Sequence, residues 1–199
     1  MNQEYINKPA VCSSFTSDSY TRFGKDRNTI VQSTCKKPYL CLECAKRQSK
    51  KRAKKWINRI DKLKPSRIEF ISINDTDNLS YSQFLSYCQK LIKSMNAKGA
   101  LLNLAICKSS HNKHIHAIVL DSENPISDID GQYTIDCQLV KPTAADLERS
   151  VMYVLKYPII DYLAGADNNL ISQEYLAILS EFQKVRPTRA IGNLANRCK

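Results

Sequence analysis

The amino-acid sequence predicts an α+β fold, in which an antiparallel β-sheet carries packed helices and follows a small Cys-rich, zinc-binding segment. Strand-like apolar alternation in the middle of the chain, flanked by segments of helical periodicity, supports the sheet and helices. Four of the eight cysteines lie in the first quarter of the 199 residues and support the zinc-binding segment. We therefore expect a zinc-binding segment and basic helix over residues 1–64, and a sheet domain over residues 65–199.

The predicted elements follow one another with turn residues between them. Helices are expected over residues 45–63, 80–97, 143–156 and 172–184. Strands are expected over residues 67–74, 100–108, 114–120 and 132–140. Pro65 ends the first helix, Ser80 and Thr143 are N-caps, and Gly99 is the expected stop of the second helix. The short polar link after residue 108 favours an antiparallel hairpin, and the order favours a sheet covered by helices on one face.

The composition points to a polyanionic partner and away from a membrane. The net charge is +11, which is typical of chains that bind nucleic acid, although a charge excess can also serve solubility alone. Apolar residues make up 43% of the chain, which is enough for a core. No apolar run approaches the roughly 18 residues of a membrane span, and the N-terminus lacks the pattern of a signal peptide. We expect a cytoplasmic protein without a membrane partner.

The cysteines near the N-terminus suggest a structural zinc site. Cys41 and Cys44 form a Cys-x2-Cys pair, with Cys35 and Cys12 upstream. Four thiolates satisfy the tetrahedral coordination of Zn²⁺, and the energy of metal binding would help to fold this polar segment. The alternatives are a redox Cys-x2-Cys pair and cysteines that bind no metal.

A run of basic residues follows the Cys-x2-Cys pair directly and falls in the first predicted helix. A DNA phosphate backbone is its natural partner, and a solvated basic face is the alternative. The candidate DNA-binding residues are Lys46, Arg47, Lys50, Lys51, Arg52, Lys54 and Lys55.

Two of the three histidines lie at alternate positions of the third predicted strand. Because side chains alternate across a strand, His114 and His116 point to the same face. Two imidazoles on one rigid face can hold a divalent metal, whereas the simpler alternative is a chance pair at the start of a strand.

Tyr153 and Tyr157 lie one helical turn apart near the end of the third predicted helix, with Lys156 between them. A tyrosine at a helix end can project into a cleft, and the lysine can neutralise phosphate charge in a transition state. The alternative is an aromatic stripe packed on the sheet. Together with the histidines and the basic character, these residues suggest metal-assisted phosphoryl transfer with a tyrosine nucleophile.

At these residues the chain resembles the HUH endonucleases, and more narrowly the initiator proteins of rolling-circle plasmid replication. Lys113-His114-Ile115-His116-Ala117 is similar to the His-hydrophobe-His motif of that family, and Lys156-Tyr157-Pro158 to its nucleophile motif. Cys41-Leu42-Glu43-Cys44, Phe70-Ile71-Ser72-Ile73-Asn74 and Arg189-Ala190-Ile191-Gly192 resemble other segments of the family in the same order.

The resemblance implies a nicking enzyme that initiates rolling-circle replication. His114 and His116 would hold Mn²⁺ or Mg²⁺. Tyr157 or Tyr153 would attack single-stranded or hairpin origin DNA, forming a 5′-phosphotyrosine and a free 3′-OH. A host helicase would be a partner. Close family members carry a glutamate where Tyr153 stands, so Tyr157 is the leading nucleophile and a pair of alternating tyrosines remains open.

Two departures from the family leave alternatives open. The strand before the histidines, residues 103–108, lacks the carboxylate that usually completes the metal site, so His111, Glu69, Asp75 or water could substitute. The family also often has a lysine three residues after the nucleophile, which is Lys156 for Tyr153 but Ile160 for Tyr157. The alternative functions are a catalytically weakened, zinc-containing DNA-binding protein and a transposase or relaxase of the same superfamily.

Overall fold

The computed structural model describes strands β1 and β2 and most of the chain from Tyr39 to Ala195. The ranges described are residues 21–23, 30–32, 38–39, 41–75, 79–106, 112–126, 133–141, 143–157, 160, 178–180, 182 and 184–195. Strands β1 (Thr21–Phe23) and β2 (Ile30–Gln32) form an antiparallel pair. The prediction for residues 1–44 contained no strand, and Cys12 and Cys35 lie outside the described ranges.

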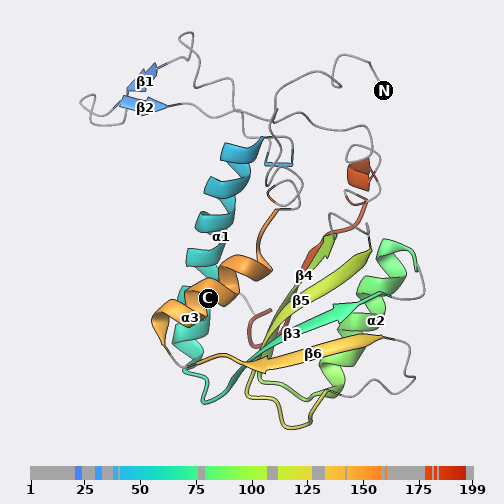
Figure 1. Cartoon of the computed structure of the whole chain (residues 1–199). Helices are drawn as coiled ribbons and strands as arrows, with labels where there is room; N and C mark the ends of the chain where they lie inside the picture. Colours follow the sequence, from blue (N-terminus) through green and yellow to red (C-terminus); the bar gives the residue numbers. More distant parts are fainter. Residues whose placement is uncertain are drawn as a thin grey trace.

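A five-stranded antiparallel sheet forms the centre of the fold (Figure 1). Its spatial order is β6-β3-β5-β4-β7. The strands are β3 (Ile68–Asn74), β4 (Gly99–Ile106), β5 (Lys113–Leu120), β6 (Thr134–Leu139) and β7 (Thr188–Gly192). The predicted α+β class, four of its strands and the β4–β5 hairpin are confirmed.

Helices cover both faces of the sheet, so the predicted one-sided arrangement is wrong (Figure 1). Helix α2 (Tyr81–Ser94) packs Phe84 and Ile92 against one face. Helices α1 (Leu42–Leu63) and α3 (Ala144–Val154) pack Ile60 and Val151 against the other. The reason lies in the strands, because buried β4 and β5 are apolar on both faces and each face needs a covering layer.

Helix α1 belongs to the same core as the sheet, although it was predicted as part of the N-terminal segment. Its buried residues Ala53 and Ile60 lie in one apolar cluster with Leu101 of β4 and Ile118 of β5. The Ser49 hydroxyl also donates to the carbonyl of Leu155 just after α3. These contacts fix α1 against α3 and the sheet, so its basic side chains have a defined orientation.

The helix ends follow the local sequence, with one exception. Ser80 and Gln83 form a capping box at the start of α2, and the Thr143 hydroxyl accepts from the backbone N–H of Asp146 at the start of α3. Gly99 does not end α2, because it is the first residue of β4. The chain turns earlier instead, at Asn96, whose φ of 49° lies in the left-handed region that asparagine tolerates.

Strand β7 is absent from the prediction because its sequence lacks a strand-like apolar run. It pairs with the edge of β4, placing Gly192 opposite Gly99. Gly192 has a φ of 59°, and a Cβ there would lie 2.7 Å from the carbonyl oxygen of Lys98, so the close approach requires glycine. Of the predicted helix over 172–184, residues 178–180 and 182 are helical and most of the rest lies outside the described ranges.

Asp121 secures the turn after β5. Its Oδ1 accepts from the N–H of Ser66 at 2.7 Å and from the N–H of Arg67 at 2.8 Å, and Lys98 lies 3.5 Å from its Oδ2. Slight burial acts to raise the pKa of Asp121, but the Arg67 and Ser66 hydrogen bonds and the Lys98 charge outweigh it and lower that pKa. Because the folded pKa lies below the unfolded one, this stabilisation is present above about pH 4 and lost as pH falls through the folded pKa.

We expect Asp121→Asn to reduce the free energy of unfolding by about 1 kcal/mol at pH 7, and by less at pH 3. Asparagine tolerates the φ of 48° at this position, so the variant tests the charge rather than the backbone. Urea unfolding of both proteins at the two pH values measures the effect. Equal destabilisation at pH 7 and pH 3 would contradict the electrostatic origin.

Among the helices that the structure describes, none is both long enough and apolar enough to span a lipid bilayer.

Candidate active site

A row of polar side chains crosses the sheet on the face covered by α1 and α3. In register across four pairings, Asp136 on β6 lies opposite Ser72, which lies opposite His116, then Asn103 and Thr188. Paired residues of adjacent strands point to the same face. His116 therefore occupies the middle of a polar row on an otherwise apolar sheet face.

The two histidines lie together, as the alternation along the strand predicts. The ring centroids of His114 and His116 are 4.6 Å apart. His116 is 8% exposed, and its Nδ1 is buried without a hydrogen-bond partner. Burial lowers the pKa of His116 to about 3, with further lowering by the neighbouring His114 and Lys156 charges. The imidazole is therefore neutral at physiological pH and keeps a nitrogen lone pair for a ligand.

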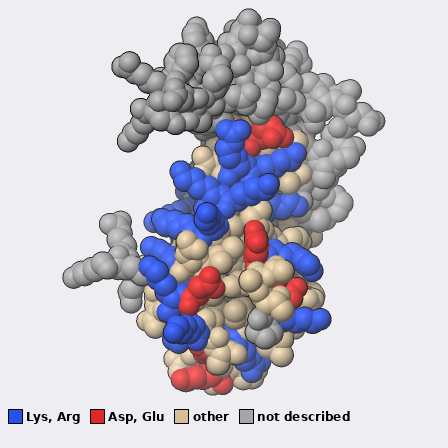
Figure 2. Space-filling view, turned by 90° about the vertical axis from the view of Figure 1, so that its left-hand side faces the viewer, with Lys and Arg blue, Asp and Glu red and all other residues tan. Residues whose placement is uncertain are grey.

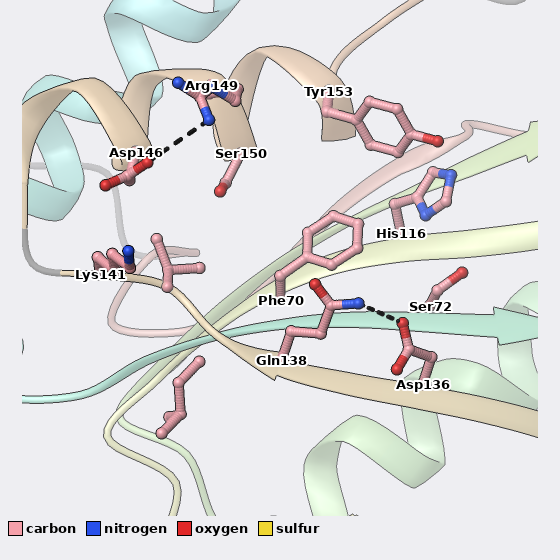
Figure 3. Close-up of a pocket in the computed structure, with 12 residues that line it drawn as sticks. Phe70, Ser72, His116, Asp136, Gln138, Lys141, Asp146, Arg149, Ser150 and Tyr153 are labelled. Atoms are coloured by element: carbon pink, nitrogen blue, oxygen red, sulfur yellow. Dashed lines mark hydrogen bonds and ion pairs between the residues drawn. The ribbon is translucent and has the colours of Figure 1, made fainter.

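Tyr153 extends from the end of α3 toward His116 (Figure 3). The two ring centroids are 4.7 Å apart, and Phe70 of β3 lies 5.5 Å from the His116 ring and 5.8 Å from the Tyr153 ring. Tyr153 remains 51% exposed, so its phenol is accessible from solvent. The Lys156 ammonium lies 5.9 Å from the centroid of the same ring. The structure thus brings Tyr153, Lys156 and the two histidines together.

Tyr157 lies elsewhere. Helix α3 ends at Val154, so the expectation that Tyr153 and Tyr157 share one helical face is wrong. The Tyr157 ring is 9% exposed, packs edge-on against Tyr39 at 4.9 Å and lies beneath the Arg52 guanidinium at 5.1 Å. It does not line the hollow that contains His116.

That hollow, called here the histidine pocket, has a volume of about 630 Å³ (Figure 3). Its floor comes from Phe70, Ser72 and His116, and its wall from α3 residues that include Tyr153. A second hollow of about 570 Å³ shares Tyr153 and Arg149 with the pocket and is lined by Lys46, Arg47 and Lys50 of α1. Tyr153 therefore stands between the histidine pocket and a basic surface.

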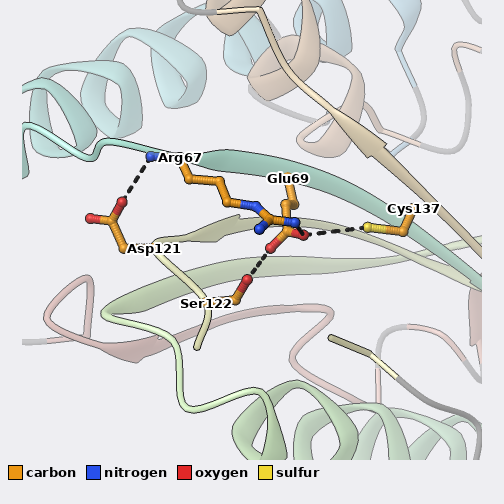
Figure 4. Close-up of polar contacts among 5 residues, drawn as sticks. All are labelled: Arg67, Glu69, Asp121, Ser122 and Cys137. Carbon is orange, nitrogen blue, oxygen red and sulfur yellow. Dashed lines mark hydrogen bonds and ion pairs between the residues drawn. The ribbon is translucent and has the colours of Figure 1, made fainter. Parts of the chain in front are cut away.

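Glu69, a candidate third metal ligand, lies on the opposite face of the sheet from His116. Glu69 is 2% exposed and accepts from Arg67 at 2.8 Å and from the hydroxyl of Ser122, with the Cys137 thiol 3.7 Å away (Figure 4). It pairs with Val119, whose side chain belongs to the α2 side of the sheet. Glu69 therefore already has hydrogen-bond partners, and the sheet separates it from His116.

Asp75 is engaged in a different contact, because its Oδ2 lies 3.2 Å from the Lys113 ammonium. His111 lies outside the described ranges. Asn103, which takes the position beside His116 on β4, accepts from the hydroxyl of Thr188 at 2.6 Å. Beside His116, strand β4 therefore has a hydrogen-bonded amide instead of a carboxylate that could complete a metal site.

Two carboxylates line the histidine pocket, Asp136 and Asp146, and Asp136 is the one in register with Ser72 and His116. The sequence alone did not single out Asp136. It is exposed on edge strand β6, and its Oδ2 accepts from the side-chain amide of Gln138 at 2.8 Å. Ser72 separates it from His116, so their backbones are about 10 Å apart at ordinary strand spacing. The sequence shows that Thr134, Asp136 and Gln138 occupy alternate positions of one strand. It does not show that this strand pairs with β3.

The site residues fit a divalent cation in part. The neutral His116 imidazole with an orphaned buried nitrogen, the adjacent His114 ring and the nearby Asp136 carboxylate are the ligand types that Mn²⁺ accepts. Within the ranges given above, no three His, Cys, Asp or Glu side chains converge on a single point. Two protein ligands with water in the other positions match this arrangement.

The basic residues of α1 do not form one surface. Lys46, Arg47 and Lys50 line the hollow beside Tyr153, whereas Arg52 and Lys55 line a different one that also contains Tyr157. Lys51 and Lys54 are exposed and line neither. Figure 2 shows Lys and Arg side chains gathered over the upper part of one side of the molecule, with acidic side chains mostly below.

Two of the four predicted zinc ligands are described. Cys41 and Cys44 are each 3% exposed and lie together at the start of α1, where the backbone N–H of Cys44 points to the Cys41 sulfur at 3.5 Å. The pair is therefore placed at the junction between the N-terminal segment and the basic helix.

Comparison with known proteins gives no family match and a weak structural likeness. No family model and no curated protein matches the chain. A solved structure, the crystal structure of the hypothetical protein ORF119 from Sulfolobus islandicus rod-shaped virus 1, is similar to it at 16% sequence identity. The similarity covers 51% of this chain and 90% of that one, with a TM-score of 0.35. Fold and site together define an α+β protein with a histidine–tyrosine pocket beside a basic helix.

Proposed function

We propose that this chain is an HUH-type endonuclease and strand transferase that nicks single-stranded origin DNA through Tyr153 to initiate rolling-circle replication. The observation that carries the proposal is the 4.7 Å separation of the Tyr153 and His116 rings. An accessible phenol, two imidazoles and flanking cations are the groups that metal-assisted phosphodiester cleavage by tyrosine uses.

Tyr153 supplies the nucleophile in this proposal. Its phenol oxygen bonds to the scissile phosphorus, and the bond from phosphorus to the 3′ oxygen breaks. The products are a 5′-phosphotyrosine and a 3′-OH. The phenol proton passes to solvent, because the side chain is 51% exposed, and a water proton completes the 3′-OH. The Lys156 ammonium, 5.9 Å from the ring centroid, offsets the negative charge of the phosphate and the developing phenolate.

His114 and His116 would hold the divalent ion, Mn²⁺ or Mg²⁺, whose positive charge polarises the scissile phosphate. The neutral state of His116 supports this role, since a protonated imidazole cannot coordinate a cation. Phe70 packs against both His116 and Tyr153 and keeps the two rings in fixed relation.

Asp136 would assist the ion through water or after a small movement of β6, an exposed edge strand. We expect Asp136→Asn to weaken Mn²⁺ binding about 10- to 100-fold, the usual range for an outer partner of a metal site. Isothermal titration with Mn²⁺ measures this effect, and Asp146→Asn on the rim of the same pocket is the matched control. Equal Mn²⁺ affinities of the two variants would show that Asp136 does not contribute to the metal site.

The DNA path in this proposal runs along the hollow between α1 and α3. Lys46, Arg47 and Lys50 line it beside Tyr153, so phosphates bound there lead to the nucleophile. A structural zinc ion held by Cys12, Cys35, Cys41 and Cys44 remains a prediction, and it would anchor the N-terminal segment at the start of this path. A host helicase also remains a predicted partner.

A zinc-containing DNA-binding protein without cleavage activity is the second candidate. It is favoured by the lack, in the described part of the chain, of a converging group of three metal-ligating side chains. It shares the basic surface with the first candidate but needs neither Tyr153 nor the histidines.

Incubation of the whole chain with single-stranded origin candidates and Mn²⁺ separates the two candidates. The endonuclease predicts an EDTA-sensitive covalent adduct, and mass mapping should locate the DNA on the peptide that contains Tyr153. Salt-sensitive binding without any adduct would favour the second candidate.

A further inference from the structure

A third hollow, which α1 also helps to line, shares no lining residue with the histidine pocket. It has a volume of about 670 Å³, lies between α1 and β7, and is called here the basic cleft. Its basic α1 residues, Arg52, Lys55 and Arg59, recur at helical spacing. This face of the helix is opposite the face of Lys46 and Lys50. The cleft therefore opens away from the approach to Tyr153.

The described residues that line the cleft are strongly cationic and include no carboxylate. Five of its lining residues are basic, namely Arg52, Lys55, Arg59, Arg186 and Arg189, and none is acidic. Within the described ranges, none of the five forms an ion pair with Asp or Glu. Partial burial lowers the pKa of Arg189, and the like charge of Arg186 lowers it further. Such uncompensated repulsion is relieved by a bound anion.

Aromatic rings are interleaved with these cations. Arg59 lies over the Trp56 ring at 4.8 Å, and Arg52 lies over the Tyr157 ring at 5.1 Å. Trp56 and Arg59 are half-buried, so their edges border the cleft and remain reachable. Guanidinium planes and aromatic rings are the surfaces on which unpaired bases stack, while neighbouring cations contact the phosphates.

We propose that the basic cleft binds a segment of single-stranded DNA, with Arg186 and Arg189 contacting phosphates and the Trp56–Arg59 pair contacting bases. The inference rests on the proposed function for its choice of DNA. It deepens that function by adding an anchor for the strand at a distance from the nucleophile. A paired duplex would present the phosphates but no base faces to Trp56.

Trp56 is the chain's single tryptophan, so its fluorescence reports on this cleft alone. We expect a single-stranded oligothymidylate, added to the whole chain without Mn²⁺ or Mg²⁺, to change the Trp56 emission. Arg186→Ala/Arg189→Ala should bind about tenfold more weakly, and the slope of log affinity against log salt should fall by about 1.4, or about 0.7 for each lost phosphate contact. Lys90→Ala/Lys93→Ala removes the same charge from exposed positions of α2 and should bind like the original chain.

The inference fails if the oligonucleotide leaves the emission unchanged, if both double variants lose affinity equally, or if duplex DNA or oligouridylate binds better than oligothymidylate. Thermal unfolding of both variants establishes that they are folded. The readout needs neither metal nor cleavage and should persist in Tyr153→Phe. If the oligonucleotide binds the cleft but no Mn²⁺-dependent adduct forms, this inference stands and the proposed nuclease is rejected. If the adduct forms but the cleft does not bind the oligonucleotide, only the cleft is rejected.

Discussion

Tyr153→Phe is expected to abolish the covalent DNA adduct, with a loss of cleavage of about 10³-fold or more, because it removes the nucleophilic oxygen and little else. The phenol is half-exposed, and the ring contacts with His116 and Phe70 survive in phenylalanine. Gel analysis of the protein–DNA adduct with Mn²⁺ measures the effect.

Tyr157→Phe is the matched control, since it removes the same atom four residues further along the sequence. Tyr157 is 9% exposed between Tyr39 and Arg52 and lines the basic cleft, so we expect its variant to keep the adduct. The opposite outcome, an adduct lost with Tyr157→Phe and kept with Tyr153→Phe, would restore the assignment that the family motif implies. Loss with both variants would indicate alternating tyrosines.

His116→Leu should abolish metal binding and cleavage while making the metal-free protein more stable. The imidazole is 8% exposed with a buried nitrogen that lacks a hydrogen-bond partner, and such a group costs about 1–3 kcal/mol. Leucine of similar size would contact the Phe70 ring without that cost, so we expect a gain of about 1 kcal/mol. A buried polar group retained at a cost in stability is typical of a functional site.

Urea unfolding with and without Mn²⁺ measures both parts of this prediction. Binding to the folded state alone stabilises the original chain by about 2.7 kcal/mol at a concentration 100 times Kd. His116→Leu should show no such increment, and Asn103→Ala, next to it on β4, should keep the increment despite lower stability. If Mn²⁺ still stabilised His116→Leu, the ion would bind at a different site.

The sequence determined the parts of this protein that depend on local order. Alternation placed His114 and His116 on one face of a strand, and the capping residues Ser80 and Thr143 fixed two helix starts within one residue. The α+β class followed from the periodicities, because helical and strand repeats are properties of neighbouring residues.

Tertiary structure decided which distant residues share the site. Pairing of β6 beside β3 brought Asp136 into the histidine pocket, while the sheet separated Glu69 from His116. The end of α3 at Val154 sent Tyr153 and Tyr157 into different hollows, and the addition of β7 beside β4 built the basic cleft. The physical reason is that strand order, the packing of helices on both faces and the path of the chain after a helix depend on long-range burial, which leaves no periodic signal in the residues concerned.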